Sequence, residues 1–222
     1  MPSRTTCLRI TTLAALCLLS TATAWSGVED SVHDFRTELS INEVCVVCHT
    51  PHNAVDPAAA GLDYAPLWGH ESTAGVYTLY SSASLDHTPG QPDGSTKLCL
   101  SCHDGSIAID NYGGTTTGTV FVDDATFDGS PGSASGSALD FGTNLDNDHP
   151  VSFSYDAVAT ADPEILPSTT ATPIGGTIAS RLLVDGKVQC SSCHDVHDVD
   201  GNPSLLVVTN DGSALCLVCH DK

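Results

Sequence analysis

Hydrophobic residues in this chain fall into short runs that are separated by long polar stretches. Residues 76–80 form one such run, and its β-branched and aromatic side chains favour a strand. Residues 178–184 form another apolar run, which also predicts a strand. Residues 113–142 are rich in Gly, Thr, Ser and Asp, which is typical of a surface loop or a small hairpin. The sequence therefore predicts mostly irregular coil with a few short strands.

The first two dozen residues have the features of a secretory signal peptide. Arg4 and Arg9 give a positive start, residues 10–19 are apolar, and residues 22–24 (Ala-Thr-Ala) are typical of a cleavage site. The apolar run is too short to cross a membrane, so we expect no membrane span. We therefore predict that residues 1–24 are removed. The protein is then exported, to the extracellular space or the cell surface, or alternatively to the periplasm.

The overall charge is strongly acidic, because 27 Asp and Glu outnumber 7 Lys and Arg and give a formal net charge of −20 at pH 7. This balance argues against nucleic acid as a partner, since its recognition needs basic patches. It favours solubility outside the cell. Aromatic residues make up only 5% of the chain, so the chain has weak means of building its own hydrophobic core.

One pattern, CxxCH, occurs four times and uses every cysteine after residue 24. It is the attachment signature of haem c, in which both thiols form thioethers to the haem and the histidine binds the iron. We therefore predict four haem c groups. The predicted attachment residues are Cys45, Cys48, Cys99, Cys102, Cys190, Cys193, Cys216 and Cys219, and the predicted proximal ligands are His49, His103, His194 and His220. A zinc protein with two Cys/His sites is the alternative, and the predicted secretory start counts against it.

Four haem groups would also compensate for the weak core. Their porphyrins supply apolar surface, and eight thioethers constrain the unfolded chain much as disulfides do. We therefore predict the fold class of a multihaem cytochrome c, in which the haems form the core and short helices lie at the CxxCH sites.

The four motifs are arranged as an internal repeat. Residues 45–52 and 190–197 share the longer pattern CxxCHxxH, and residues 98–104 and 215–221 share LCxxCHD. A lone histidine with a phenylalanine shortly after it precedes each pair of motifs. The sequence therefore predicts two dihaem modules, 25–145 and 146–222, in a single compact tetrahaem unit.

A c-type haem iron takes its sixth ligand from His or Met, or keeps that position open. Methionine is excluded, because the only Met is Met1 in the predicted signal peptide. Six histidines lie outside the motifs, enough for bis-histidine ligation of all four irons, which predicts low reduction potentials. The expected distal ligands are His33, His52, His149 and His197, with His70 as the alternative and His87 as the bystander.

His52 and His197 each follow a proximal histidine by three residues, on the same face of the turn. The distal side of that haem lies across the porphyrin, and so short a tether cannot reach it. Each must therefore bind a different haem or none. One scheme sends His197 to the haem of His103 and His52 to the haem of His220 in another copy. Such a head-to-tail contact propagates into a filament unless it closes a ring.

The repeat extends this scheme, because equivalent lone histidines should then serve equivalent haems. It pairs His33 with His49 and His149 with His194. A competing scheme sends both tethered histidines to the second haem of their own module, and it keeps the protein monomeric. The sequence leaves the two schemes open.

Three segments carry a family resemblance: CHTPHN at 48–53, DHPVSF at 148–153 and CSSCHDVH at 190–197. They resemble the doubled-CXXCH multihaem cytochromes, in particular extracellular tetrahaem cytochromes that polymerise into filaments. The resemblance implies bis-histidine haems in a continuous line, with one axial histidine donated across each subunit interface, and it suggests His52 as that donor. The implied partners are other copies in a head-to-tail homopolymer, redox partner cytochromes and extracellular electron acceptors.

The predicted function is therefore extracellular electron transfer along a haem chain, and we expect no enzyme. A monomeric periplasmic electron shuttle is the first alternative. A multihaem reductase of a small nitrogen compound is the second, but it would need one iron with an open sixth position and acid–base groups beside it. The surplus of histidines makes such an open position unnecessary.

Overall fold

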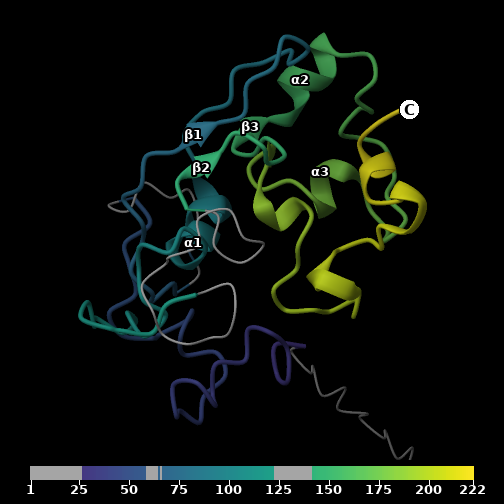
Figure 1. Ribbon diagram of the computed structural model, residues 1–222. Helices are drawn as coiled ribbons and strands as arrows, with labels where there is room; N and C mark the ends of the chain where they lie inside the picture. Colours follow the sequence, from purple (N-terminus) through teal and green to yellow (C-terminus); the bar gives the residue numbers. More distant parts are fainter. Residues whose placement is uncertain (1–26, 59–64, 66, 123–141) are drawn as a thin grey trace, which may run out of the picture.

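The computed structural model describes residues 27–58, 65, 67–122 and 142–222. The predicted signal peptide lies outside this part, as do residues 123–141 of the predicted loop. Irregular chain connects short helices and strands (Figure 1), so the prediction of a mostly irregular fold is confirmed. None of the helices in the described residues has the length and apolar character that spanning a membrane requires.

The CxxCH motifs carry much of the helical structure. Helix α1 (Gly94–His103) ends on the second motif. The 3-10 turns η1 (Cys190–Ser192) and η4 (Cys216–Val218) begin at the first cysteine of the third and fourth motifs. The first motif forms hydrogen-bonded turns instead. The prediction of short helices at these sites is therefore confirmed for three of the four motifs.

The remaining helical segments lie in the second half of the chain. They are α2 (Tyr155–Ala161), α3 (Ile178–Arg181) and the 3-10 turns η2 (Pro203–Leu205) and η3 (Asp211–Ser213). Each is at most seven residues long, so the surrounding packing must stabilise them rather than helix propensity alone.

The strand predicted at residues 178–184 is wrong, because this run begins with α3. The Thr177 side chain accepts the backbone N–H of Ser180, and the backbone N–H of Thr177 donates to Ser180 Oγ, which makes a capping box. Ile178 and Leu182 then lie on one face of the turn, and both are buried. The four-residue spacing of apolar side chains thus favours a helical turn here.

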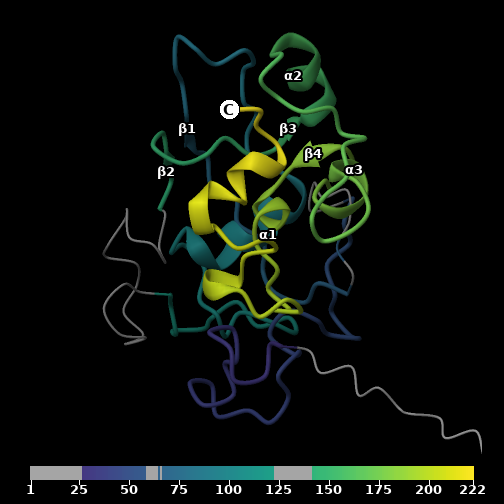
Figure 2. The ribbon, with the colours of Figure 1, turned by 90° about the vertical axis from the view of Figure 1, so that its right-hand side faces the viewer.

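Two small sheets of two strands each tie the coil together (Figures 1 and 2). Strand β1 (Thr78–Leu79) pairs in parallel with β2 (Asn144–Leu145). It lies within residues 76–80, so the strand predicted there is confirmed. Strand β3 (Phe153–Ser154) pairs antiparallel with β4 (Lys187–Val188), directly before the third motif.

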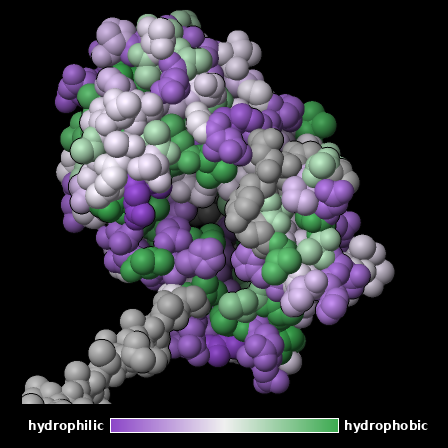
Figure 3. All heavy atoms as spheres, turned by 180° about the vertical axis from the view of Figure 1, so that it is seen from behind, coloured by the Kyte–Doolittle hydropathy of each residue, from purple (hydrophilic) through white to green (hydrophobic). Residues whose placement is uncertain are grey.

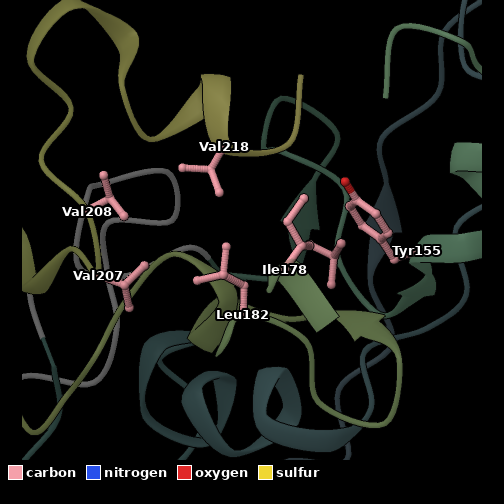
Figure 4. Close-up of a cluster of buried hydrophobic side chains, with 7 residues drawn as sticks. Tyr155, Ile178, Leu182, Val207, Val208 and Val218 are labelled. Carbon is pink, nitrogen blue, oxygen red and sulfur yellow. The ribbon is translucent and has the colours of Figure 1, made fainter. Parts of the chain in front are cut away.

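The hydrophobic core is divided into several small clusters. The largest among the described residues lies in the second half of the chain (Figure 4) and consists of Tyr155, Ile178, Leu182, Val188, Val207, Val208 and Val218. Smaller clusters form around Val47 and Ile109 and around Tyr77 and Leu100. On the face shown in Figure 3, hydrophobic residues are scattered among hydrophilic ones. The chain thus does not build one continuous core from these side chains.

Candidate haem sites

Each CxxCH motif folds into one helical turn that gathers its two thiols and its imidazole. The backbone N–H of the motif histidine donates to the carbonyl of the first cysteine, at 2.8 Å in the first motif and 3.0 Å in the third and fourth. The second motif is the last turn of α1. A bond between residues four apart places their side chains on one face. Each motif therefore presents the three groups that covalent attachment of haem c needs.

Three of the four motif histidines face a histidine from outside the motifs. In each pair the two residues are far apart in the sequence, and the ring centres are separated by nearly the same distance. The pairs are His33–His103 at 6.1 Å, His49–His197 at 6.3 Å and His149–His220 at 6.4 Å. The fold thus brings one further imidazole to the first, second and fourth motifs.

These separations fit a metal ion held between the two rings of each pair. A bond from a metal to an imidazole nitrogen is about 2.0–2.1 Å, so two imidazoles on opposite sides of one metal have ring centres roughly 6 Å apart. Within the described residues, no group of three or more His, Cys, Asp or Glu side chains forms a site for a free metal ion. The ring-centre spacing of each pair fits two axial imidazoles on one haem iron.

Hydrogen bonds orient two of the imidazoles. His149 Nδ1 donates to the carbonyl of Pro150 at 2.9 Å, and His194 Nδ1 donates to the carbonyl of Ser204 at 3.0 Å. A carbonyl can only accept, so the proton of each neutral ring is on Nδ1. This leaves Nε2 as the atom that can bind a metal.

His33 lies where the second and third motifs meet. Burial, together with the charges of His103 and His194, lowers its pKa to about 4. Its ring also packs edge-on against Phe35, with ring centres 6.0 Å apart. His33 is therefore a neutral imidazole at pH 7, which is the form that binds metal.

His194 is the motif histidine that no imidazole faces among the described residues, and His52, His70 and His87 are the histidines outside the motifs that face no motif histidine. All ten histidines are among the described residues, and no imidazole faces His194 at a separation comparable to that in the three pairs. The side chain of His52 is exposed, and its ring likewise faces no other histidine ring in the described part of the chain. One motif histidine and one expected distal ligand, His52, thus have no counterpart among the described residues.

His70 and His87 have different surroundings from the paired histidines. Both ring nitrogens of buried His70 point to backbone carbonyls, those of Glu71 at 2.8 Å and Ala108 at 3.0 Å. His87 packs on Phe153 with ring centres 4.2 Å apart, and neither of its buried ring nitrogens has a hydrogen-bond partner. Burial lowers the pKa of both rings. The ring nitrogens of His70 are therefore occupied, which argues against its role as the alternative ligand.

The observed pairs differ from those that the sequence repeat suggests. His197 faces His49 rather than His103, and His33 faces His103 rather than His49. The backbone carbonyls of residues 197 and 198 lie against Gly27, where an added Cβ would come within 2.5 Å of one of them. Packing between the two halves thus carries His197 back to the first motif, and the repeat alone does not contain this information.

The fourth motif also departs from the expected pairing. His149 faces His220 rather than His194, so His220 already has an imidazole partner within its own chain. The fold thus offers His149 for the place at His220 that one scheme gave to His52 of another copy. The competing monomeric scheme is also not observed, because neither tethered histidine faces the second motif of its own module.

The four motifs are neighbours in space in the order in which they occur in the sequence. Side chains of consecutive motifs interact electrostatically in each case. The interacting pairs are Cys48 with Cys102, Cys99 with Cys190, and Cys193 with Cys219. Each motif therefore lies close to the next one in the sequence.

A comparison with protein families matches residues 183–222 to the family of the doubled CXXCH motif. The matched segment contains the third and fourth motifs. No curated protein sequence matches the chain. The CXXCH motifs indicate covalent binding of haem c. The doubled motif supports a multihaem c-type cytochrome that functions in electron transfer.

Proposed function

We propose that this protein transfers electrons through four haem c groups, each ligated by two histidines, that are stacked in a chain. The observation that carries this proposal is the set of three imidazole pairs with ring centres 6.1–6.4 Å apart. Every pair joins one CxxCH histidine to one histidine from outside the motifs. This is the arrangement that two axial ligands of one haem iron require.

The chain would hold and orient the haems, and bound haem supplies the one-electron chemistry of its iron. The proximal ligands are His49, His103, His194 and His220, and the distal ligands within the chain are His197 for the first site, His33 for the second and His149 for the fourth. Two imidazoles on an iron leave no open position for a substrate. At the first, second and fourth sites this ligation favours electron transfer over the reductase alternative, and at the third site the same conclusion requires a ligand from another copy.

The haems are also proposed to form the core of the fold and a continuous path through it. The small, separate hydrophobic clusters and the 5% aromatic content support a core that the porphyrins complete. The proximity of consecutive motifs supports transfer from the first haem to the fourth without a long gap. Four porphyrins in one chain of this size bring neighbouring rings close together.

The third site is proposed to receive its distal ligand from His52 of a neighbouring copy. Support comes from His194, whose Nδ1 bond to Ser204 leaves Nε2 for a metal and which no imidazole faces in the described part of the chain, and from the exposure of His52. Donor and acceptor are different residues on the two copies, so the contact is heterologous. Such a heterologous contact repeats head-to-tail and builds an open filament unless it closes a ring. The sequence resemblance to the filament-forming cytochrome OmcE suggests the same kind of assembly.

The filament is proposed to act outside the cell. The secretory features of residues 1–24 and the net charge of −20 support export and solubility there. Its partners would be other copies of itself, redox partner cytochromes and extracellular electron acceptors. The periplasm is the alternative location.

The substitution His52→Ala tests the assembly, with His87→Ala as the matched control at an unassigned histidine. We expect the wild-type protein and His87→Ala to carry four haems by mass, to form filaments in negative-stain images and to show only low-spin haem. His52→Ala should also carry four haems, but remain monomeric with one high-spin haem in its optical and paramagnetic resonance spectra. Filaments with an unchanged spectrum in His52→Ala would refute the shared ligand. Wild-type protein that stays monomeric at all concentrations would favour the shuttle.

A further inference from the structure

A buried polar network joins the first turn of α1 to η1, and it links residues about ninety positions apart in the sequence. Its centre is the Gln189 side chain, which is only 1% exposed. Gln189 Oε1 accepts the backbone N–H of Thr96 and the hydroxyl of Ser152, both at 3.2 Å, and Gln189 Nε2 donates to Asp93 Oδ1 at 2.9 Å. Two of these three bonds, to Thr96 and to Asp93, cross the boundary between the two halves of the chain.

Further bonds of the network join the same two segments. The backbone N–H of Cys190 donates to Thr96 Oγ1 at 3.0 Å, and the hydroxyls of Ser95 and Ser191 lie 2.6 Å apart. Lys187 forms an ion pair with Asp93. We call this set of residues (93, 95, 96, 152, 187 and 189–191) the polar clamp. Its hydrogen bonds hold backbone N–H groups on both sides of the boundary, those of Thr96 and Cys190.

The polar clamp lies next to two of the haem attachment residues. Cys99 is one helical turn after Ser95 and Thr96 on α1, and Cys190 is itself held by the clamp. The side chains of Cys99 and Cys190 interact with each other. Gly94 has a φ of +48°, and an added Cβ would come within 3.0 Å of Gln189 Nε2, so the two segments approach closely here.

From this geometry we propose that the polar clamp fixes the spacing and mutual orientation of the second and third haems. The inference rests on the proposed function, since it requires haem at both motifs. Hydrogen bonds are directional, whereas apolar contacts are not, so a buried polar joint sets a defined geometry. Electronic coupling between two haems falls steeply with their separation. The clamp residues would therefore be positioning residues for the central step of electron transfer.

Two substitutions across the joint, Gln189→Leu and Thr96→Val, test this role. Thr96→Val keeps the side-chain shape and removes only the hydroxyl, so it decides the test if Gln189→Leu does not accumulate. The matched control is Asn111→Leu, which removes a buried amide bonded only within the first half of the chain, to Glu71 at 2.7 Å and to Gly118 at 2.6 Å.

The readouts are haem content by mass and the bisignate Soret circular dichroism that coupled haems produce. We expect four haems in all variants, with a partial loss of the bisignate signal in Gln189→Leu and Thr96→Val and none in Asn111→Leu. An undiminished signal in both joint variants would overturn the clamp proposal and leave the proposed function intact. Wild-type protein without haem at residues 99–103 or 190–194 would overturn both.

Discussion

Each imidazole pair joins residues with different local constraints. The motif histidine is fixed by its helical turn, while its partner comes from irregular chain and depends on packing for its position. His33 shows how this works, because its burial keeps it neutral at pH 7 and its edge contact with Phe35 orients it toward His103. The chain thus prepares the distal ligand by desolvation and packing.

Replacing His33 with methionine should change one haem potential. Methionine raises the potential of a c-type haem relative to histidine, and axial ligands set potentials over a range of about 0.8 V. We expect His33→Met to raise the midpoint potential of one haem by on the order of 0.1 V, measured by spectroelectrochemical titration. His87→Met is the control and should leave every midpoint near its wild-type value. Equal shifts in both variants would contradict the assignment of His33.

His70 and His87 should differ in what they contribute to stability. His70→Phe leaves a buried carbonyl that has lost its donor, since the neutral ring carries one N–H, and this costs about 1–3 kcal/mol of unfolding free energy. His87→Phe keeps the ring contact with Phe153 and removes two unpaired buried nitrogens, so it should be neutral or stabilising. Denaturant unfolding measures both effects. Loss of low-spin haem in either variant would show that its histidine is an iron ligand.

At the scale of elements, the sequence predicts where regular structure lies better than it predicts whether that structure is a helix or a strand. The CxxCH turns follow directly from the motif, and the strand at residues 76–80 follows from its residue types. Helix α3 could have been found from Thr177 and Ser180, whose spacing permits a capping box, and from the apolar spacing of Ile178 and Leu182. A short apolar run by itself does not distinguish strand from helix, and here the cap decides.

Helix α3 should also contribute strongly to stability through Ile178. This side chain is fully buried in the largest hydrophobic cluster, and truncation of such a residue costs about 2–5 kcal/mol. We expect Ile178→Ala to lower the unfolding free energy by that amount in a denaturant titration of the haem-loaded protein. Val199→Ala, at a side chain that is 73% exposed, should change it by less than about 0.5 kcal/mol. Similar losses in both variants would contradict the role of the cluster.

At the scale of the molecule, the sequence indicates the candidate ligands but not their pairing. Residue types and motif spacing are local properties, so they single out His33, His149 and His197 without a structure. The pairing depends on how the two halves pack, for example through the contact of Gly27 with residues 197 and 198. His197 faces His49 and not the adjacent His194, in keeping with its short tether. The assembly proposed for His52 therefore rests on the exposure of its side chain and on the lack of an imidazole facing His194 among the described residues.

The charge of the molecule should control that assembly. Each copy carries a formal net charge of −20, so neighbouring copies in a filament repel one another. The screening length is about 30 Å at 0.01 M salt and about 8 Å at 0.15 M. We expect the minimum protein concentration for filament formation to be lower at the higher salt concentration than at the lower one. Light scattering and negative-stain counting measure it.

The direction of this salt effect separates two kinds of interface. A contact held by the bond between an imidazole and iron gains from screening, because salt weakens the repulsion between acidic copies and leaves the ligation intact. A contact held by opposite charges would lose strength as salt is added. His52→Ala should form no filaments at either salt concentration, since screening cannot replace the missing ligand. Filaments that dissolve at 0.15 M salt would therefore point to charge pairing, and the donated histidine would no longer be needed to explain assembly.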